Sequence, residues 1–379
     1  MGEDALGLKG ALKHAVLGCV ASAERFLAPV GQVPLKEYKN CLLLHYMTAL
    51  GTAVHATPLI RALHDAQPNT SIAVAADSFT LPLIAHHPVV DRVIATPSPL
   101  TDLRVAANVL RGAKPFAGEP FLAIAAVGNE RTRIALATLM SGAGARVGFT
   151  EAPELYQMSL EFDPRLSLID NNLRIVEALG NAFRHYEPEV HFREEDLHWA
   201  QDALRTSGLR DGQIPVAFVT QTSVTQRKGW RPQRFQAAAR YMAERYNAHI
   251  IFVGTQSESA AIDAIRAGLG DATSSFAGKT TLLQLAALLS LCRVGLTLDT
   301  GILHLGRSVG LPMAIIAPAW SPPIEWLPIG NPRYRILKNA EMPSAPPGYI
   351  IDEVSVEEAT AALEELVATY PEGARGFGD

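Results

Sequence analysis

The feature that most constrains the fold is a regular alternation of short, continuously apolar segments with amphipathic helical patterns. The apolar segments of the first half are CLLLHY, SIAVAA, DRVIAT, FLAIAAV and ARVGF, at 41–46, 71–76, 91–96, 121–127 and 145–149. Strands that are apolar throughout, rather than at every second residue, are typical of a parallel sheet covered on both faces. The pattern therefore predicts a doubly wound α/β domain.

A second alternation of the same kind follows a polar, proline-spaced stretch at 185–196, which is typical of a linker. Its apolar segments are PVAFVT, AHIIFVG, VGLTLD and PMAIIAP, at 215–220, 248–254, 294–299 and 312–318. Two Rossmann-like, parallel-sheet domains are therefore expected to face each other across a cleft, which is a natural place for two substrates.

The length of 379 residues suits this division into domains. We expect an N-terminal helical arm at 1–37, a first domain at 38–190 and a second domain at 191–345. A final helix within 346–379 is expected to pack back on the first domain.

Composition excludes several classes of protein. With 48% apolar and 19% charged residues, the chain can bury large cores and is not disordered. Its net charge of −5 gives no sign of a nucleic-acid partner. The cysteines Cys19, Cys41 and Cys292 have neither disulfide-type nor metal-type spacing. This usage favours a reducing cytoplasm.

The arm has a helical pattern at 8–30 and a trace of a signal peptide, but its apolar core is very short. It lacks the run of about 20 apolar residues that a membrane span needs. Two interpretations stay open. The arm is either a helix packed on the fold or a surface helix at the inner face of the membrane, with Lys9, Lys13, His14 and Arg25 near the lipid headgroups.

One apparent motif is rejected. Residues 278–281 read Gly-Lys-Thr-Thr, the end of a phosphate-binding P-loop. The complete motif needs a glycine five residues earlier, where the chain has Thr273, and a preceding core strand, for which DATSSFA is a poor candidate. We interpret the segment as a turn in which Thr280 or Thr281 caps the next helix.

The strongest local candidate for a binding site is VGLTLDTGILHL, at 294–305. A buried strand is expected to end at Leu298, and a helix to begin after the turn formed by Asp299, Thr300 and Gly301, with His304 one turn in. Free backbone N–H groups, a hydroxyl and the helix dipole would meet there, which suits a diphosphate. The alternative is simple helix capping with a core histidine.

A second polar segment follows the strand PVAFVT. It reads TQTSVTQRKGW, contains several hydroxyl groups and ends in Arg227 and Lys228. It is a candidate phosphate-binding loop, although Lys228 could equally be a solvated surface charge.

The turn after the first strand raises the same question. HYMTALGTAVHATP, at 45–58, places a turn at 49–52 and a helix start near Ala53. A strand-to-helix turn with a glycine is a common ligand site in α/β proteins, and it is also an ordinary way to reverse the chain.

Several motifs, taken in order, resemble those of one family. TALGTAVHATP is similar to SALGDVVHTTP, PVVDRVI to PDVDRVI, and NERTRIALATLMSGAGARVGF to NLRSALLARLSGARRRIGF. Lys228, Trp230 and Pro232 match K-x-W-P, while GKTTLLQLAALL and DTGILHLG are similar to GKTSLRELAALL and DTGPMHLA. The chain thus resembles glycosyltransferase family 9, the lipopolysaccharide heptosyltransferases, over about residues 40–337.

This resemblance implies a GT-B fold whose second domain holds a nucleoside-diphosphate sugar, with ADP-heptose as the expected donor. Asp299, Thr300 and Gly301 would bind the pyrophosphate through their backbone amides, with His304 nearby. Lys228 would be catalytic, because it neutralises charge on the departing diphosphate.

Further donor contacts carry over in the same way. Glu258 would bind the nucleoside ribose, and Thr222 and Ser223 would line the phosphates. The resemblance implies no metal and no other cofactor, since a lysine and a helix end supply the positive field. The acceptor would be a glycan or lipid-linked hydroxyl bound by the first domain.

The first domain departs from the family at the position that matters most for catalysis. The residue after Gly51 is an aspartate in the family, the general base, and here it is Thr52. A threonine hydroxyl is not a useful base at neutral pH. Upstream, Tyr46 replaces a lysine or arginine.

Three hypotheses follow. Another residue serves as the base, with His55 as the first candidate and Glu130 and His45 as further ones; Glu130 and Arg131 would lie on the acceptor side. Alternatively, the acceptor needs little assistance from a base. The last hypothesis is a non-catalytic protein, a scaffold or regulator that binds nucleotide sugars.

Overall fold

The structure is a computed structural model that describes residues 2–27, 34–221, 228–321, 323–339 and 341–376. The chain divides into two compact units, Met1–Tyr186 and Glu187–Asp379. The division falls inside the predicted linker, shortly before the expected boundary at 190. Each unit is described by itself.

Unit 1 is built on a six-stranded sheet in which every neighbouring pair is parallel. Its strands are β1 (Asn40–His45), β2 (Ser71–Ala76), β3 (Arg92–Ala95), β4 (Leu122–Ala125), β5 (Ala145–Phe149) and β6 (Met158–Leu160). The spatial order is β3-β2-β1-β4-β5-β6. The strand order therefore reverses between β1 and β4, and the carboxyl ends of these two strands form the first switch point.

The helices of unit 1 pack in two groups. They are α1 (Gly2–Leu27), α2 (Leu50–His55), α3 (Thr57–Ala66), α4 (Leu81–Ile84), α5 (Leu103–Ala113), α6 (Thr132–Met140) and α7 (Leu168–Ala178), with 3-10 turns η1 (Leu35–Glu37) and η2 (Pro153–Leu155). Helices α2, α3 and α7 pack on one another and form the first group. Helices α5 and α6 pack on each other and form the second. The apolar cluster under α5 and α6 contains Leu42, Leu44, Leu110 and Ile134.

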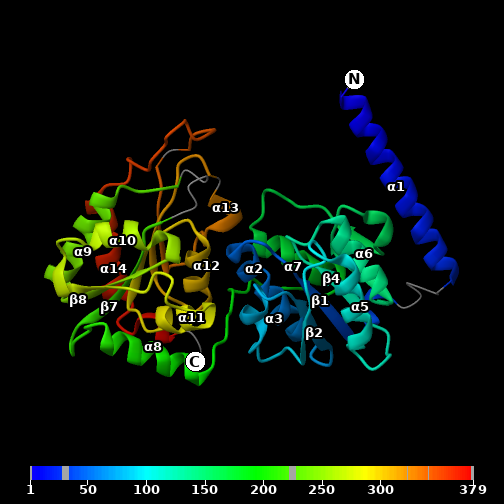
Figure 1. The fold of residues 1–379 in the computed structure, drawn as a ribbon, viewed down its shortest axis with the longest axis horizontal. Helices are drawn as coiled ribbons and strands as arrows, with labels where there is room; N and C mark the ends of the chain where they lie inside the picture. The colour runs from blue at the N-terminus through cyan, green and yellow to red at the C-terminus, as the bar shows by residue number, and fades with distance from the viewer. Residues whose placement is uncertain (1, 28–33, 222–227, 322, 340, 377–379) are drawn as a thin grey trace. The chain divides into compact units, whose positions relative to one another are not determined.

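Unit 2 repeats this architecture (Figure 1). Its strands are β7 (Ile214–Val219), β8 (Ala248–Val253), β9 (Thr273–Ser275), β10 (Val294–Leu298), β11 (Met313–Ile316) and β12 (Tyr334–Leu337). The order is β12-β11-β10-β7-β8-β9, and every pair is parallel. The order reverses between β7 and β10, whose carboxyl ends form the second switch point. The two sheets confirm the predicted α/β, GT-B-like pair of Rossmann-like domains.

The helices of unit 2 include the final helix of the chain, which was expected to pack on the first domain. They are α8 (Glu194–Thr206), α9 (Pro232–Tyr246), α10 (Ser259–Arg266), α11 (Leu282–Ser290), α12 (Gly301–Ser308), α13 (Pro323–Trp326) and α14 (Val356–Thr369), with η4 (Gln256–Glu258), η5 (Gly270–Ala272) and η6 (Gly373–Gly376). The final helix α14 packs on α9, β10 and β11, and buries Leu363 and Leu366 in the core of unit 2. The expectation that it packs back on the first domain is therefore wrong.

The chain leading to α14 is also tied to unit 2. The indole N–H of Trp230 donates to the carbonyl oxygen of Val354 at 2.9 Å, and Arg231 pairs with Asp352. These contacts join the start of α9 to the segment before α14, which explains why the last helix belongs to this sheet.

The N-terminal arm forms the helix α1, and one face of it packs on unit 1. Leu17 and Ala21 are buried against a cluster that includes Leu155. Glu24 forms a bidentate ion pair with Arg146, with N–O distances of 2.9 and 2.5 Å, and only 1% of the arginine side chain is exposed. These contacts agree with the interpretation of the arm as a helix packed on the fold.

The opposite face of α1 is exposed at Leu12, Val16, Cys19 and Phe26. None of the helices in the described residues combines the length and the apolar character that crossing a bilayer requires. Contact of the exposed face with lipid stays a prediction.

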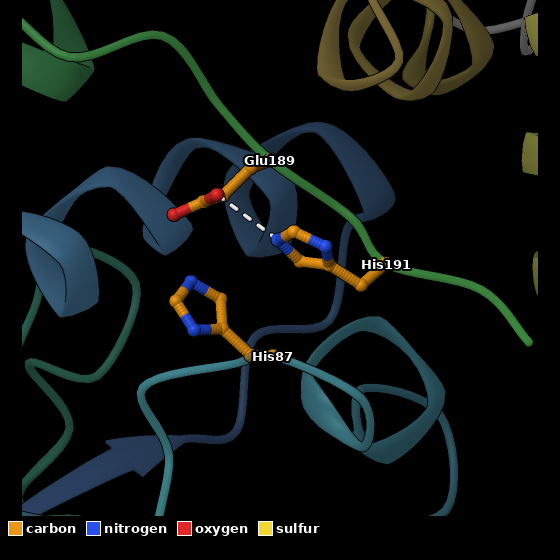
Figure 2. Close-up of side chains that lie close together, drawn as sticks. All are labelled: His87, Glu189 and His191. Carbon is orange, nitrogen blue, oxygen red and sulfur yellow. Dashed lines mark hydrogen bonds and ion pairs between the residues drawn. The ribbon is translucent and has the colours of Figure 1, made fainter. Parts of the chain in front are cut away.

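The predicted linker has no helix or strand between α7 and α8. At the start of unit 2, Glu189 Oε2 and His191 Nε2 lie 2.9 Å apart and form a hydrogen bond within this segment (Figure 2). Two residues before Glu189, Glu187 pairs with the buried guanidinium of Arg307 on α12, with Nε–Oε2 at 2.5 Å. This polar stretch, which contains one proline, is thus held against α12 near its start by the Glu187–Arg307 ion pair.

Candidate active site

The second switch point brings together two of the predicted donor residues. Lys228 follows β7 in the chain, and Asp299 follows β10, the neighbouring strand. Lys228 Nζ lies 2.5 Å from Asp299 Oδ2, and the two side chains are only 11% and 5% exposed. Lys228 is therefore not a solvated surface charge. The ammonium group also lies 5.7 Å from the centroid of the Trp320 ring, a distance at which a cation and an aromatic face attract each other.

The start of α12 has free hydrogen-bonding capacity. Thr300 stands at the N-cap in extended conformation, yet its side chain makes no capping bond. Its Oγ1 is buried and has no hydrogen-bond partner among the described residues. By contrast, Thr281 and Ser355 cap α11 and α14 through their hydroxyl groups. The first N–H groups of a helix need a partner, so α12 begins with backbone donors and a hydroxyl that a bound anion could satisfy.

Two titratable side chains border this ion pair. Burial lowers the pKa of the His304 imidazole to about 4, and the positive charges of Arg307 and Lys228 add to the effect against the opposing pull of Asp299. The His304 ring lies 5.9 Å from that of Trp326, centroid to centroid. Partial burial raises the pKa of Glu325, in spite of the nearby Lys228.

Glu325, Trp320 and Trp326 are neighbours of the site that the sequence analysis missed. They come from the loop after β11 and from the short helix α13. The available signal was position alone, because the carboxyl ends of parallel strands meet at one edge of a sheet.

The first switch point has a different composition. The turn after β1 leads directly into α2, which begins at Leu50, three residues earlier than predicted. The two histidines on either side of this turn, His45 at the end of β1 and His55 at the end of α2, are both buried. His45 is buried, and its Nε2 lies 3.0 Å from the carbonyl oxygen of Ala53; burial lowers the pKa of this imidazole to about 4. His55 is 1% exposed, and Asn172 binds its carbonyl oxygen.

The burial of both imidazoles argues against His55 and His45 as the general base, because a base must reach the substrate hydroxyl. Tyr46 is buried as well, and desolvation raises its pKa far above the ordinary value. A tyrosine carries no positive charge in either protonation state, so Tyr46 does not replace the charge of the lysine or arginine at this turn.

Thr52 meets the loop after β4. Gly128 has a φ of +96°, and a Cβ atom added to it would lie 2.8 Å from Thr52 Cγ2 and 2.9 Å from Met47 Cγ. The side chain of Thr52 thus packs directly on the glycine. Gly128 N–H donates to Glu130 Oε1 at 2.7 Å, so the glutamate occupies the same loop.

A buried asparagine holds this arrangement together. Asn129 accepts from the backbone N–H of Tyr46 at 3.1 Å and donates to the carbonyl oxygen of Leu44 at 3.1 Å. It thereby fastens the β4 loop to the end of β1. No pattern in the sequence marks Asn129 as functional, although it opens the motif that includes Glu130. Arg131 points elsewhere: it is mostly exposed and pairs with Glu151 at 3.2 Å.

The family of the chain follows from its sequence. A sequence model described as glycosyltransferase family 9 (heptosyltransferase) matches residues 125–345, more than half of the chain. The chain belongs to glycosyltransferase family 9. A search among curated proteins finds no match.

Solved structures of family 9 proteins and heptosyltransferases share the fold. A family 9 glycosyltransferase from Veillonella parvula is 21% identical, covers 88% of this chain and 98% of its own, and superposes with a TM-score of 0.78. Escherichia coli ADP-heptose LPS heptosyltransferase II is 15% identical, with 87% and 99% covered and a TM-score of 0.71. E. coli heptosyltransferase WaaC, solved with ADP-2-deoxy-2-fluoro heptose, is 14% identical, with 86% and 99% covered and a TM-score of 0.63.

One residue that the family resemblance assigns to donor binding, Glu258, also has a structural role in this chain. Glu258 Oε2 accepts from the backbone N–H of Thr255 at 2.7 Å as half of a capping box. Contact with a ribose stays a prediction for this side chain, which would have to use its other oxygen or release the cap. Thr222 and Ser223 lie outside the described residues.

Proposed function

We propose that this family 9 protein transfers a sugar from a nucleoside diphosphate, with ADP-heptose as the expected donor, to a hydroxyl group of a glycan or lipid-linked acceptor. The donor diphosphate binds at the second switch point, on the first turn of α12. In the proposed reaction, the protein uses neither a metal ion nor another cofactor.

The observation that carries the proposal is the uncapped start of α12 beside a buried lysine. A threonine at an N-cap ordinarily satisfies one of the first backbone N–H groups, and Thr300 does not. A diphosphate oxygen placed there would accept from these N–H groups and from Thr300 Oγ1, in the favourable field of the helix dipole.

Lys228 gives the site its chemistry. Transfer leaves a diphosphate that gains negative charge as the glycosidic bond breaks, and a cation fixed at that point stabilises the transition state more than the bound substrate. Asp299 holds the ammonium group at 2.5 Å and so keeps it in place in a largely buried site. The same carboxylate would repel a phosphate, which leaves Asp299 to face the sugar hydroxyls or the lysine.

One observation favours a second candidate function. Thr52 stands where the family motif has its aspartate, so a protein that binds nucleotide sugars without turnover, a scaffold or regulator, is the alternative. This alternative shares the donor site and differs only in the first unit.

Thermal unfolding with a panel of ADP, ADP-heptose, GDP-mannose and UDP-glucose tests the donor site. A ligand at 100 times its dissociation constant stabilises the folded state by about 2.7 kcal/mol. We expect ADP and ADP-heptose to raise Tm, with and without EDTA, and Thr300→Val to weaken both.

Binding of a GDP or UDP sugar alone would contradict the proposed donor. A requirement for divalent metal would contradict the metal-free mechanism. Product formation from ADP-heptose and a lipid-linked glycan, followed by mass spectrometry, separates the transferase from the binding protein.

A further inference from the structure

We infer that Glu130 is the general base of the transfer reaction, held at the first switch point in place of the carboxylate that Thr52 lacks. The inference rests on the proposed transferase function and assigns the step that function leaves without a residue. It depends on three observations within unit 1.

The first observation is the place of the residue in the sheet. Thr52 follows β1, and Glu130 follows β4, the adjacent strand across the switch point. Open α/β sheets bind ligands at the carboxyl ends of strands where the strand order reverses. Glu130 therefore comes from the one other loop that shares this position with the Thr52 turn.

The second observation is direct packing between the two loops. Gly128 has the left-handed φ of +96°, and Thr52 Cγ2 fills the space where its Cβ would stand. Asn129, fully buried, bonds to the backbone of both Leu44 and Tyr46 and fixes the loop against β1. The glutamate thus stands on a rigid support, one residue after the asparagine.

The third observation concerns the carboxylate itself. Glu130 is half-buried, and its Oε1 accepts from Gly128 N–H at 2.7 Å. The other oxygen, Oε2, has no protein partner among the described residues. One oxygen orients the group while the second stays available, which is the arrangement that proton transfer requires.

The other titratable side chains of this region are poor candidates. His45 and His55 are buried, and the pKa of His45 lies at about 4 because of that burial. Asp77 caps the residues after β2 with its Oδ1, which accepts from the N–H groups of Phe79 and Thr80. Glu151 is engaged by Arg131.

The sequence differs from the family motif at the positions of both Thr52 and Glu130. The motif that this chain resembles has aspartate at the position of Thr52, and when the longer motif is matched at Asn129 it has leucine at the position of Glu130. Here the carboxylate is absent from the first position and present at the second. Two carboxylates close to Gly128 would repel each other, so the gain of one fits the loss of the other.

In the proposed transfer step, the proton of the acceptor O–H group moves to Glu130 Oε2 while the acceptor oxygen bonds to the anomeric carbon of the donor. The bond from that carbon to the diphosphate oxygen breaks, and its electron pair leaves with the nucleoside diphosphate. Glu130 then loses its proton to water.

The test compares the full-length wild type with Glu130→Gln, which keeps an oxygen for the Gly128 N–H but cannot take a proton. We expect kcat to fall by about 100-fold or more, the acid limb of the pH–rate profile to disappear, and ADP affinity to stay unchanged. Glu130→Asp, which keeps a shorter carboxylate, should retain the acid limb with an intermediate rate. Glu161→Gln, an exposed glutamate on the same unit, is the matched control.

A rescue experiment excludes a merely structural role. Thr52→Asp in the Glu130→Gln background places a carboxylate on the residue that packs on Gly128, and we expect it to restore part of the lost rate. A Glu130→Gln protein with wild-type kcat and pH profile would overturn the inference, and so would loss of ADP binding or of Tm together with rate in both Glu130 variants.

Failure of the proposed function looks different. A wild-type protein that does not bind ADP refutes the donor site, whereas one that binds ADP-heptose but never transfers it refutes the transferase and the base together. An active wild type with an active Glu130→Gln variant refutes the base alone.

Discussion

The two switch points have the same topology and opposite chemistry. At the second, a lysine and an aspartate from neighbouring strands form a buried ion pair beside an uncapped helix. At the first, His45 and His55 beside the corresponding turn are buried, and Glu130 accepts a hydrogen bond from the backbone N–H of Gly128. The comparison teaches that the same strand order can carry loops of very different charge and burial, so the residues on the adjoining loops, and not the topology, set the chemistry that each switch point offers.

The comparison also separates the two halves of a transfer reaction. A leaving diphosphate needs fixed positive charge, which burial makes effective because few water molecules screen it. An acceptor hydroxyl needs a group that can take a proton, which must stay accessible. Lys228 satisfies the first condition and Glu130 the second, so neither unit alone has the complete set.

The largest effect is expected from removing the charge at the second switch point. Lys228→Met keeps most of the side-chain volume but removes the cation, and we expect kcat to fall by a factor of about 100 to 1,000, near 3 kcal/mol of transition-state stabilisation. The affinity for ADP should fall much less, because charge on the leaving group grows toward the transition state. Steady-state kinetics with calorimetric titration of ADP separates the two quantities.

The control for this variant addresses Asp299, which Lys228→Met leaves buried without its partner. Losing one member of a buried pair costs about 3 to 5 kcal/mol of stability, so Lys228→Met with Asp299→Asn is compared with the single variant by urea denaturation. Equal losses in ADP binding and in kcat would make Lys228 an ordinary ground-state contact.

An effect of middle size is expected from the buried histidines, one at each switch point. Burial lowers the pKa of His45 and of His304 to about 4, against an ordinary value of 6.5. The unfolded chain therefore binds more protons between pH 6.5 and 4, and stability falls as the pH is lowered through this window. From pH 7 to pH 5, each imidazole contributes a loss of up to about 2 kcal/mol.

Urea denaturation at pH 7 and pH 5 measures this loss. His45→Gln and His304→Gln should each lose less stability on acidification than the wild type, by about the same amount. A variant with the full wild-type loss would show that its histidine can take up a proton in the folded protein, and would mark that switch point as the more open of the two.

The sequence predicted the parts of the fold that long apolar patterns specify. Both six-stranded sheets were expected as parallel and doubly wound, because β1, β4, β7 and β10 are apolar at nearly every position. The short edge strands β6, β9 and β12 were missed, since strands of three or four residues with polar neighbours give no clear pattern. The direction in which α14 packs was also wrong, because an amphipathic helix does not show which sheet it covers.

The sites were predictable to a lesser degree, since motifs identify residues but not their partners. The DTG turn and Lys228 were both singled out, but the 2.5 Å bond between Lys228 and Asp299 joins positions 71 residues apart. Glu130 was one candidate among several for the base. The packing of Gly128 on Thr52, the half-exposed carboxylate and the burial of His45 and His55 distinguish it from the others, and none of these can be read from the sequence.

The smallest effect is expected at the Gly-Lys-Thr-Thr turn, which tests whether ligand chemistry is confined to the switch points. The turn follows β9, the edge strand of its sheet. Lys279 Nζ donates to the carbonyl oxygen of Ser275 at 2.9 Å, and Thr281 caps α11 in a capping box. Lys279→Ala should therefore leave ADP affinity and kcat unchanged within twofold.

Thr281→Ala, in contrast, should lower stability by about 1 kcal/mol through loss of the N-cap, again without an effect on ADP binding. Calorimetric titration and urea denaturation of the two variants provide the measurements. A tenfold loss of ADP affinity in Lys279→Ala would show that an edge strand of this sheet holds the nucleotide. That result would show that ligand chemistry is not confined to the two switch points, because a phosphate would then bind where the strand order does not reverse.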